Sequence, residues 1–153
     1  MRRGLFLLTF LCSFLGAVTP LQPHDRVPTL NLLDQYDHTV TIDKDARFLI
    51  YTAQKDVALE VANILEQKEQ LLRAKKIYFL SDISDIPSFI ASWFAIPKMR
   101  SYPFSILLIQ QEQISDYFGA TEGHVTLYSL EQSKVQKVVS LTPTQLKQFL
   151  EQL

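Results

Sequence analysis

The side chains that most often carry catalysis or bind metals are few and widely spaced in this chain. It has one cysteine, Cys12, and three histidines, His24, His38 and His124. A metal site needs ligands at matched spacings, supported by a second layer of hydrogen bonds, and the histidines show no such spacing. We expect them to be surface or loop residues, and we predict neither a metal site nor a bound cofactor.

Other sequence patterns of catalytic sites are also missing. A Gly-x-Ser-x-Gly turn, which would expose a serine nucleophile, does not occur. With only four glycines, the chain has no glycine-rich loop for phosphate. Asp82 and Asp85 could exchange protons as an acidic pair, but their place in a polar segment favours turn and helix-start roles. The sequence therefore predicts no catalytic residue.

Residues 1–19 have the composition of a secretory signal peptide, in which arginines precede an apolar run. We expect cleavage near Ala17, although the residues around it match a cleavage site poorly, and retention as an uncleaved anchor is the alternative. Leu11 precedes Cys12 where a lipoprotein would have a small residue, so we do not expect lipidation. These features predict an exported protein, periplasmic in a bacterium or otherwise secreted.

Removal of this leader would leave no cysteine, and hence no disulfide, thiolate nucleophile or cysteine metal site. Without Arg2 and Arg3, 13 of the 15 basic residues remain against 16 acidic ones, so the formal net charge changes from −1 to −3. That balance, with a charged fraction of 20%, excludes a nucleic-acid binder that relies on a basic surface. We predict no nucleic-acid partner, and a membrane partner only if the leader is retained.

Length and hydrophobic pattern indicate one α/β domain. Of the 153 residues 47% are hydrophobic, enough for a substantial core. We assign residues 20–29 to an extended lead-in and residues 30–153 to the domain. The predicted strands are residues 30–34, 39–42, 47–53, 77–80, 104–109, 125–130 and 135–141.

Helices are predicted between these strands. One begins at about Asp56, its N-cap, and carries its apolar stripe as far as Leu72. Because this helix joins two buried strands, a parallel crossover is expected. Residues 81–85 are predicted to form a polar loop, and residues 87–95 a helix. The prolines from Pro97 on are expected to end this helix.

The C-terminal helix has the clearest start signal. Thr142 is placed as its N-cap, Pro143 takes the first helical position, and Gln145 completes a capping box. A further short amphipathic segment is expected at residues 114–118.

Four stretches of the chain match a known pattern. Residues 27–34 have a proline–hydrophobic–leucine–aspartate opening, and the others are residues 48–53, 102–120 and 124–150. In this order they resemble the thioredoxin-like superfamily, and within it the redoxin branch of TlpA-type thiol-disulfide oxidoreductases and peroxiredoxin-like proteins. The resemblance implies a thioredoxin-like fold, with a mixed central sheet flanked by helices and an N-terminal β-hairpin.

The redox residues of that superfamily are absent from the matching positions. In the family, the turn after the first central strand carries a reactive cysteine at a helix N-terminus, which lowers the thiol pKa. Here residues 53–59 contain no sulfur. The family also has a cis-proline before the closing hairpin. In this chain Glu122, Gly123 and His124 occupy that position. Pro103 precedes a different strand, and its peptide bond is expected to be trans. The resemblance therefore implies a redoxin scaffold without thiol chemistry.

Two groups of residues are candidates for binding. The resemblance places His124 beside the turn of Gln54, Lys55 and Asp56, which forms the first group. The second lies in residues 82–100, a segment unusually rich in apolar and aromatic residues that either packs on one face of the sheet or docks a partner. Its candidate contacts are Trp93, Phe94 and Met99 as anchors, with Lys98 and Arg100 at the rim.

The function we expect is that of an exported thioredoxin-fold domain that binds a protein partner in the cell envelope and has no catalytic activity. One alternative is a redox-accessory protein or enzyme that uses the non-cysteine residues around Gln54, Lys55 and His124. Another is a membrane-tethered structural subunit that keeps its leader.

Overall fold

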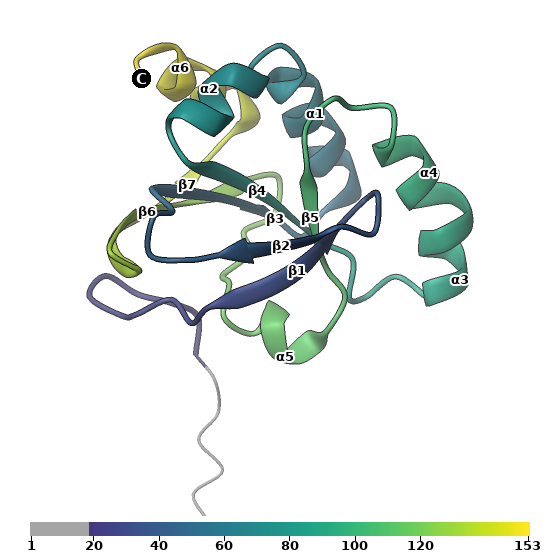
Figure 1. Cartoon of the computed structure of the whole chain (residues 1–153), viewed down its shortest axis with the longest axis horizontal. Helices are drawn as coiled ribbons and strands as arrows, with labels where there is room; N and C mark the ends of the chain where they lie inside the picture. Colours follow the sequence, from purple (N-terminus) through teal and green to yellow (C-terminus); the bar gives the residue numbers. More distant parts are fainter. Residues whose placement is uncertain (1–18) are drawn as a thin grey trace, which may run out of the picture.

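The computed structural model describes residues 19–153 and has one mixed sheet at its centre (Figure 1). The strand order is β2-β1-β5-β4-β3-β6-β7. Their bounds are β1 (Leu30–Asp34), β2 (Thr39–Ile42), β3 (Phe48–Thr52), β4 (Ile77–Asp82), β5 (Ile106–Ile109), β6 (Val125–Glu131) and β7 (Lys134–Leu141). The expected leader, apart from Thr19, lies outside the described residues, and so does Cys12.

The three central strands are parallel, and the outer strands are antiparallel to their neighbours. β4 pairs in parallel with β3 on one side and with β5 on the other, so the predicted crossover is confirmed. β1 with β2, and β6 with β7, form the hairpins at the two ends of the sheet. All four residues of β5 are buried, as expected for a strand covered on both faces.

Helices cover one face of this sheet (Figure 1). They are α1 (Lys55–Leu65), α2 (Glu69–Ala74), α3 (Ser88–Ile90), α4 (Ile96–Met99) and α6 (Pro143–Glu151), with a π-helical turn, η1 (Ala91–Ala95), between α3 and α4. Apolar residues of α1, α2, η1, α4 and α6 pack with Ile50, Phe79 and Ile106 of the central strands, whereas α3 buries none. The helical layer therefore closes the larger core.

The opposite face is covered by the lead-in and by the segment around α5 (Glu112–Ser115). Leu21 and Val27 of the lead-in and Phe118 are buried against Leu49 and Leu107 of the sheet. A hydrophobic core thus lies on each face of the sheet.

The lead-in also pairs with the sheet at the start of β7. Arg26 forms an isolated antiparallel bridge with Lys134. The His24 amide donates to the Val135 carbonyl at 2.8 Å, and the Val135 amide donates to the Asp25 carbonyl at 2.9 Å. The lead-in thus pairs with the start of β7 in the manner of a short additional strand at this edge of the sheet.

Two expectations about the first helix are wrong. The helix ends at Leu65, and Leu72 belongs to the separate helix α2. Between them, residues 66–70 are all polar, so no apolar side chain anchors that stretch to the sheet. Asp56 is not the N-cap, because Gln54 occupies that position, and Asp56 lies in the first turn.

Two boundaries in the second crossover, from β4 to β5, also differ from the prediction. β4 continues to Asp82, so only residues 83–85 of the predicted loop lie outside the strand. The helical segment does not stop at Pro97 but runs to Met99. In η1, the Ile96 amide donates to the Ala91 carbonyl, five residues back, and Pro97, which has no amide proton, then stands in the first turn of α4, where proline is tolerated.

The C-terminal predictions are confirmed. The Gln145 amide donates to the Thr142 hydroxyl, and the Thr142 amide donates to the Gln145 side chain, which completes the capping box. Gln132 and Ser133 both have positive φ, as a two-residue turn between β6 and β7 requires. Within residues 19–153, no helix is long and apolar enough to cross a membrane.

Candidate functional site

The turn where the family would carry its cysteine joins β3 to α1. The Gln54 side chain at the helix N-cap turns away from the helix and accepts a hydrogen bond from the Gly123 amide at 2.7 Å. His124 follows directly, and its Nδ1 lies 2.7 Å from the Glu122 carbonyl oxygen. The predicted neighbourhood of Gln54 and His124 is therefore present.

An amide contact, not a cis-proline, connects these two loops. No peptide bond between residues 19 and 153 is cis, Pro103 included. Gly123 has a φ of 71°, which suits glycine, and this allows its amide to face Gln54. Lys55 and Asp56 are exposed at the same corner.

Thr52, the last residue of β3, is buried beneath this turn with its hydroxyl unsatisfied. It is 1% exposed, and its Oγ1 has no hydrogen-bond partner among the described residues. A buried polar group without a partner costs free energy, whereas an apolar group of similar shape does not.

Thr52→Val is therefore expected to raise the free energy of unfolding by about 1 kcal/mol. Urea denaturation followed by circular dichroism measures the change. The matched control is Thr126→Val, because the buried Thr126 hydroxyl donates to the Gly119 carbonyl, and this variant should be less stable. Equal losses in both variants would show that the Thr52 hydroxyl is satisfied.

A second polar cluster is centred on Asp82. It lies on the face of the sheet that the lead-in and the α5 segment cover. Tyr51 donates to Asp82 Oδ2 at 2.8 Å, and the Ser115 hydroxyl donates to the same oxygen. The Ser84 amide and hydroxyl donate to Oδ1 at 3.0 and 2.7 Å. Both carboxylate oxygens are thus engaged, which supports the turn role predicted for Asp82.

Tyr51 stays protonated near neutral pH in this cluster. Burial of its ring raises the pKa of the phenol well above its usual value, and the hydrogen bond to Asp82 and the negative charge of Asp82 raise it further. Its ring also stacks on Phe118, with centroids 5.0 Å apart. The sequence pattern had shown Tyr51 only as a strand residue.

The α3–η1–α4 segment exposes four large apolar side chains. The exposed fractions are 64% for Phe89, 38% for Ile90, 76% for Trp93 and 69% for Phe94. We refer to these four residues as the aromatic surface. The sequence had singled out Trp93 and Phe94, but not Phe89 and Ile90.

The other side of the same segment packs on the core, so the packing expected for residues 82–100 is confirmed. Ala91 is buried, and Ile96 and Met99 are half-buried against the helical-side core. Met99 is thus partly a packing residue. Figure 1 shows α3 and α4 at the rim of the molecule, beside α1.

A narrow groove of about 60 Å³ separates α1 from η1 and α4. Ala58, Leu59 and Ala62 line it on the α1 side. Lys55 of the first predicted group and Lys98 and Met99 of the second also line it. The structure therefore brings members of both groups to one groove, and among its lining residues only the two lysines carry charge.

Arg100, predicted at the rim, is held in place by contacts within the protein. Its Nε donates to the Gln35 carbonyl at 2.7 Å, and its guanidinium contacts Asp37 at 3.2 Å. The Tyr36 hydroxyl donates to the Arg100 carbonyl at 2.8 Å. Arg100 thus joins the end of α4 to the turn between β1 and β2.

Comparisons with known proteins identify the fold. No protein-family model and no curated protein matches the sequence. Among solved structures, peroxidoxin BcpB from Mycobacterium tuberculosis is 14% identical, with a TM-score of 0.58 over 87% of this chain and 98% of its own. The thioredoxin domain of a thiol-disulfide oxidoreductase from Bacteroides vulgatus is 13% identical, with a TM-score of 0.57 over 86% and 97%.

A peroxiredoxin-like protein from Aquifex aeolicus gives the same result, with 12% identity and a TM-score of 0.55 over 89% of this chain and 90% of its own. The similarity extends over most of each chain. Identities this low establish the fold alone.

Proposed function

We propose that this chain, whose fold is thioredoxin-like, is an exported binding domain without catalytic activity, and that its aromatic surface docks a protein partner in the cell envelope. The observation that carries the proposal is the exposure of Phe89, Ile90, Trp93 and Phe94 from one helical segment. Contiguous exposed apolar groups favour a docking surface, since single exposed apolar residues are common and clusters are not.

The aromatic surface has the properties of an interaction site. Tryptophan and other aromatic side chains contribute much of the binding energy at protein interfaces. The segment is also held in place, because Arg100 and Tyr36 connect its end to the β1–β2 turn. A surface that is already ordered loses less conformational entropy when it binds.

The adjoining groove suggests the chemistry of the partner. Its apolar floor suits one inserted aliphatic or aromatic side chain. Lys55 and Lys98 at its edge favour acidic residues beside that side chain. We therefore propose a partner segment in which an apolar anchor is flanked by aspartate or glutamate.

The absence of thiol chemistry is supported by the sequence at the critical turn. The only cysteine is Cys12, within the expected leader, and residues 53–59 contain none. The amide oxygen of Gln54 accepts from Gly123 at that position. Export is supported by the composition of residues 1–19.

Trp93→Ala is expected to weaken partner binding by about tenfold or more and to change the free energy of unfolding by less than about 0.5 kcal/mol. The reason is that Trp93 is 76% exposed and contributes little to the core. The partner would be identified by co-purification from the native envelope, and its affinity for each variant measured by calorimetry.

The matched control is Leu33→Ala, which removes an exposed apolar side chain from β1. It should leave partner affinity unchanged. A Trp93 variant with full affinity and a lower melting temperature would refute the docking role. Reduction of insulin disulfides or of a hydroperoxide above the uncatalysed rate would refute the non-catalytic assignment.

A further inference from the structure

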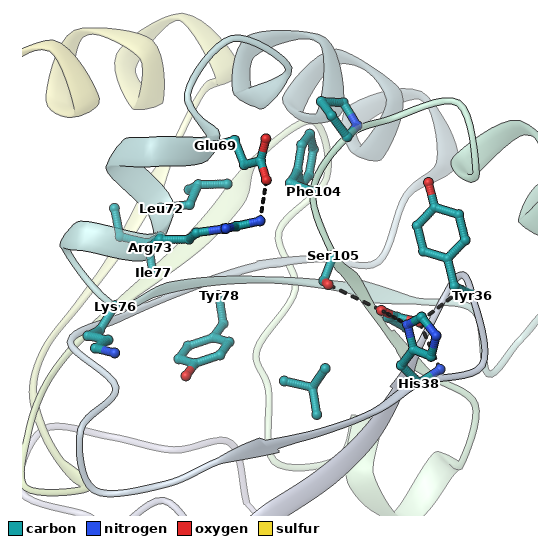
Figure 2. Close-up of a pocket in the computed structure, with 13 residues that line it drawn as sticks. Tyr36, His38, Glu69, Leu72, Arg73, Lys76, Ile77, Tyr78, Phe104 and Ser105 are labelled. Carbon is teal, nitrogen blue, oxygen red and sulfur yellow. Dashed lines mark hydrogen bonds and ion pairs between the residues drawn. The ribbon is translucent and has the colours of Figure 1, made fainter.

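A cavity of about 460 Å³ lies at the opposite end of the parallel strands from the turn after β3 (Figure 2). It is bounded by the β1–β2 turn, by α2, by the start of β4 and by residues 103–105. Its volume is in the range of sites that hold one small molecule. The proposed docking surface does not include it.

The cavity is a consequence of how the strands pair. β4 begins at Ile77, but its pairing with β5 begins only at Phe79, opposite Ile106. The residues before β5 are drawn to the β1–β2 turn, because the Gln35 side chain donates to the Phe104 carbonyl at 2.7 Å and accepts from the Ile106 amide at 2.8 Å. The opening beside the start of β4 is thus fixed by buried hydrogen bonds.

The two carboxylates in the wall already have partners. Asp34 accepts hydrogen bonds from the His38 amide and from the Ser105 hydroxyl. Glu69 forms an ion pair with Arg73 along α2. Figure 2 shows the Glu69–Arg73 ion pair and the hydrogen bond donated by Ser105 at the edges of the cavity. Neither acid therefore presents an uncompensated negative charge to a ligand.

Lys76 supplies a positive charge without such a partner. Within residues 19–153 its ammonium makes no ion pair and no hydrogen bond, and it lines the cavity beside Tyr78. Burial, with the charges of Asp43 and Asp45, raises the pKa of Tyr78, so its phenol remains a hydrogen-bond donor. Asp43 and Asp45 do not line the cavity but their charges act at Tyr78, so Lys76 supplies the attraction for an anionic group and the Tyr78 phenol supplies a hydrogen bond.

The remainder of the wall is largely apolar, with Val40, Leu72, Ile77 and Phe104 around the same space. We infer that the cavity binds a small organic acid, with its carboxylate at Lys76 and Tyr78 and a flat apolar body against Leu72 and Phe104. This inference does not depend on the proposed docking function.

Naphthoate is a suitable probe, because it combines a carboxylate with a flat apolar ring. Added to the purified protein, it is expected to shift the amide signals of Arg73, Tyr78 and Ser105 in a saturable way. Lys76→Asn should weaken its binding about fivefold. Asparagine is chosen because Lys76 has a φ of 52°, and asparagine tolerates this left-handed conformation.

The matched control is Lys75→Asn, which removes a neighbouring exposed charge that does not line the cavity. It should leave naphthoate affinity unchanged. Naphthol, which has no carboxylate, should bind the original protein and the Lys76 variant equally. Val40→Phe should block both probes by filling the cavity.

Three results would overturn the inference. The first is the absence of saturable naphthoate binding. The second is a set of shifts confined to the aromatic surface around Trp93. The third is an equal loss of affinity in the Lys75 and Lys76 variants, which would show a general charge effect.

Discussion

Replacing Gln35 with methionine is expected to lower the free energy of unfolding by about 2–5 kcal/mol. Gln35 is fully buried. Its side-chain amide donates to the Phe104 carbonyl and accepts from the Ile106 backbone amide. The same side-chain nitrogen lies 3.4 Å from the Met99 carbonyl oxygen. Methionine has a similar volume but cannot form these bonds, so two backbone groups would be buried without partners.

Urea denaturation at neutral pH measures this loss. The control is Gln148→Met on α6, an exposed position, where the change should be less than about 0.5 kcal/mol. Amide exchange at Ile106 should also accelerate in the Gln35 variant. A loss no larger than that of the control would mean that water or a backbone shift replaces the amide.

The second large effect is expected at Asp34, which is 3% exposed. Burial alone raises the pKa of this carboxyl, but the hydrogen bonds from the His38 and Tyr36 amides and from Ser105, with the nearby charge of His38, outweigh burial and bring the pKa below its usual value. The ionised carboxylate therefore stabilises the folded protein. Asp34→Asn should cost about 1–3 kcal/mol near neutral pH.

Because the pKa of Asp34 is lowered in the folded protein, its contribution to the free energy of unfolding depends on pH. A carboxyl with a lower pKa in the folded protein stabilises it above the unfolded pKa, about 3.9, and this contribution disappears as the pH falls through the folded pKa. The difference between the original protein and Asp34→Asn should therefore narrow in acid. Denaturation curves from neutral pH down to about pH 3 test it.

A suitable control is Asp116→Asn, because Asp116 is exposed and its carboxylate accepts no hydrogen bond in the part of the chain that the structure describes. Its cost should stay below about 0.5 kcal/mol throughout. A difference at Asp34 that is constant with pH would mean that packing, not charge, sets its contribution.

The fold could be predicted because its elements have strong local signals. The residues of β3 and β5 form short continuous apolar runs, and Thr142 with Gln145 marks a helix start that needs no distant contact. The end of α1 was missed because apolar spacing continues to Leu72 across a polar interruption. Spacing alone does not show where a helix changes direction.

The candidate site was predictable only in part. Composition pointed to Trp93 and Phe94, but which side of the helix faces outward depends on η1, whose wider turn rotates the residues after it. Gln35 gave no signal, and Asp34 was seen only as the last residue of the redoxin-like opening, because their partners Phe104 and Ser105 are 69 and 71 residues away. The cavity arises from the same distant contacts.

The short pairing of the lead-in with β7 has a consequence for solubility. A sheet edge with free amides and carbonyls can pair with the edge of another molecule and so begin aggregation. Asp25 and His24 bond to Val135, and the Val27 amide donates to Ser133, so this part of the edge is already occupied. A shortened chain that began at Leu30 would expose it and would be more prone to self-association.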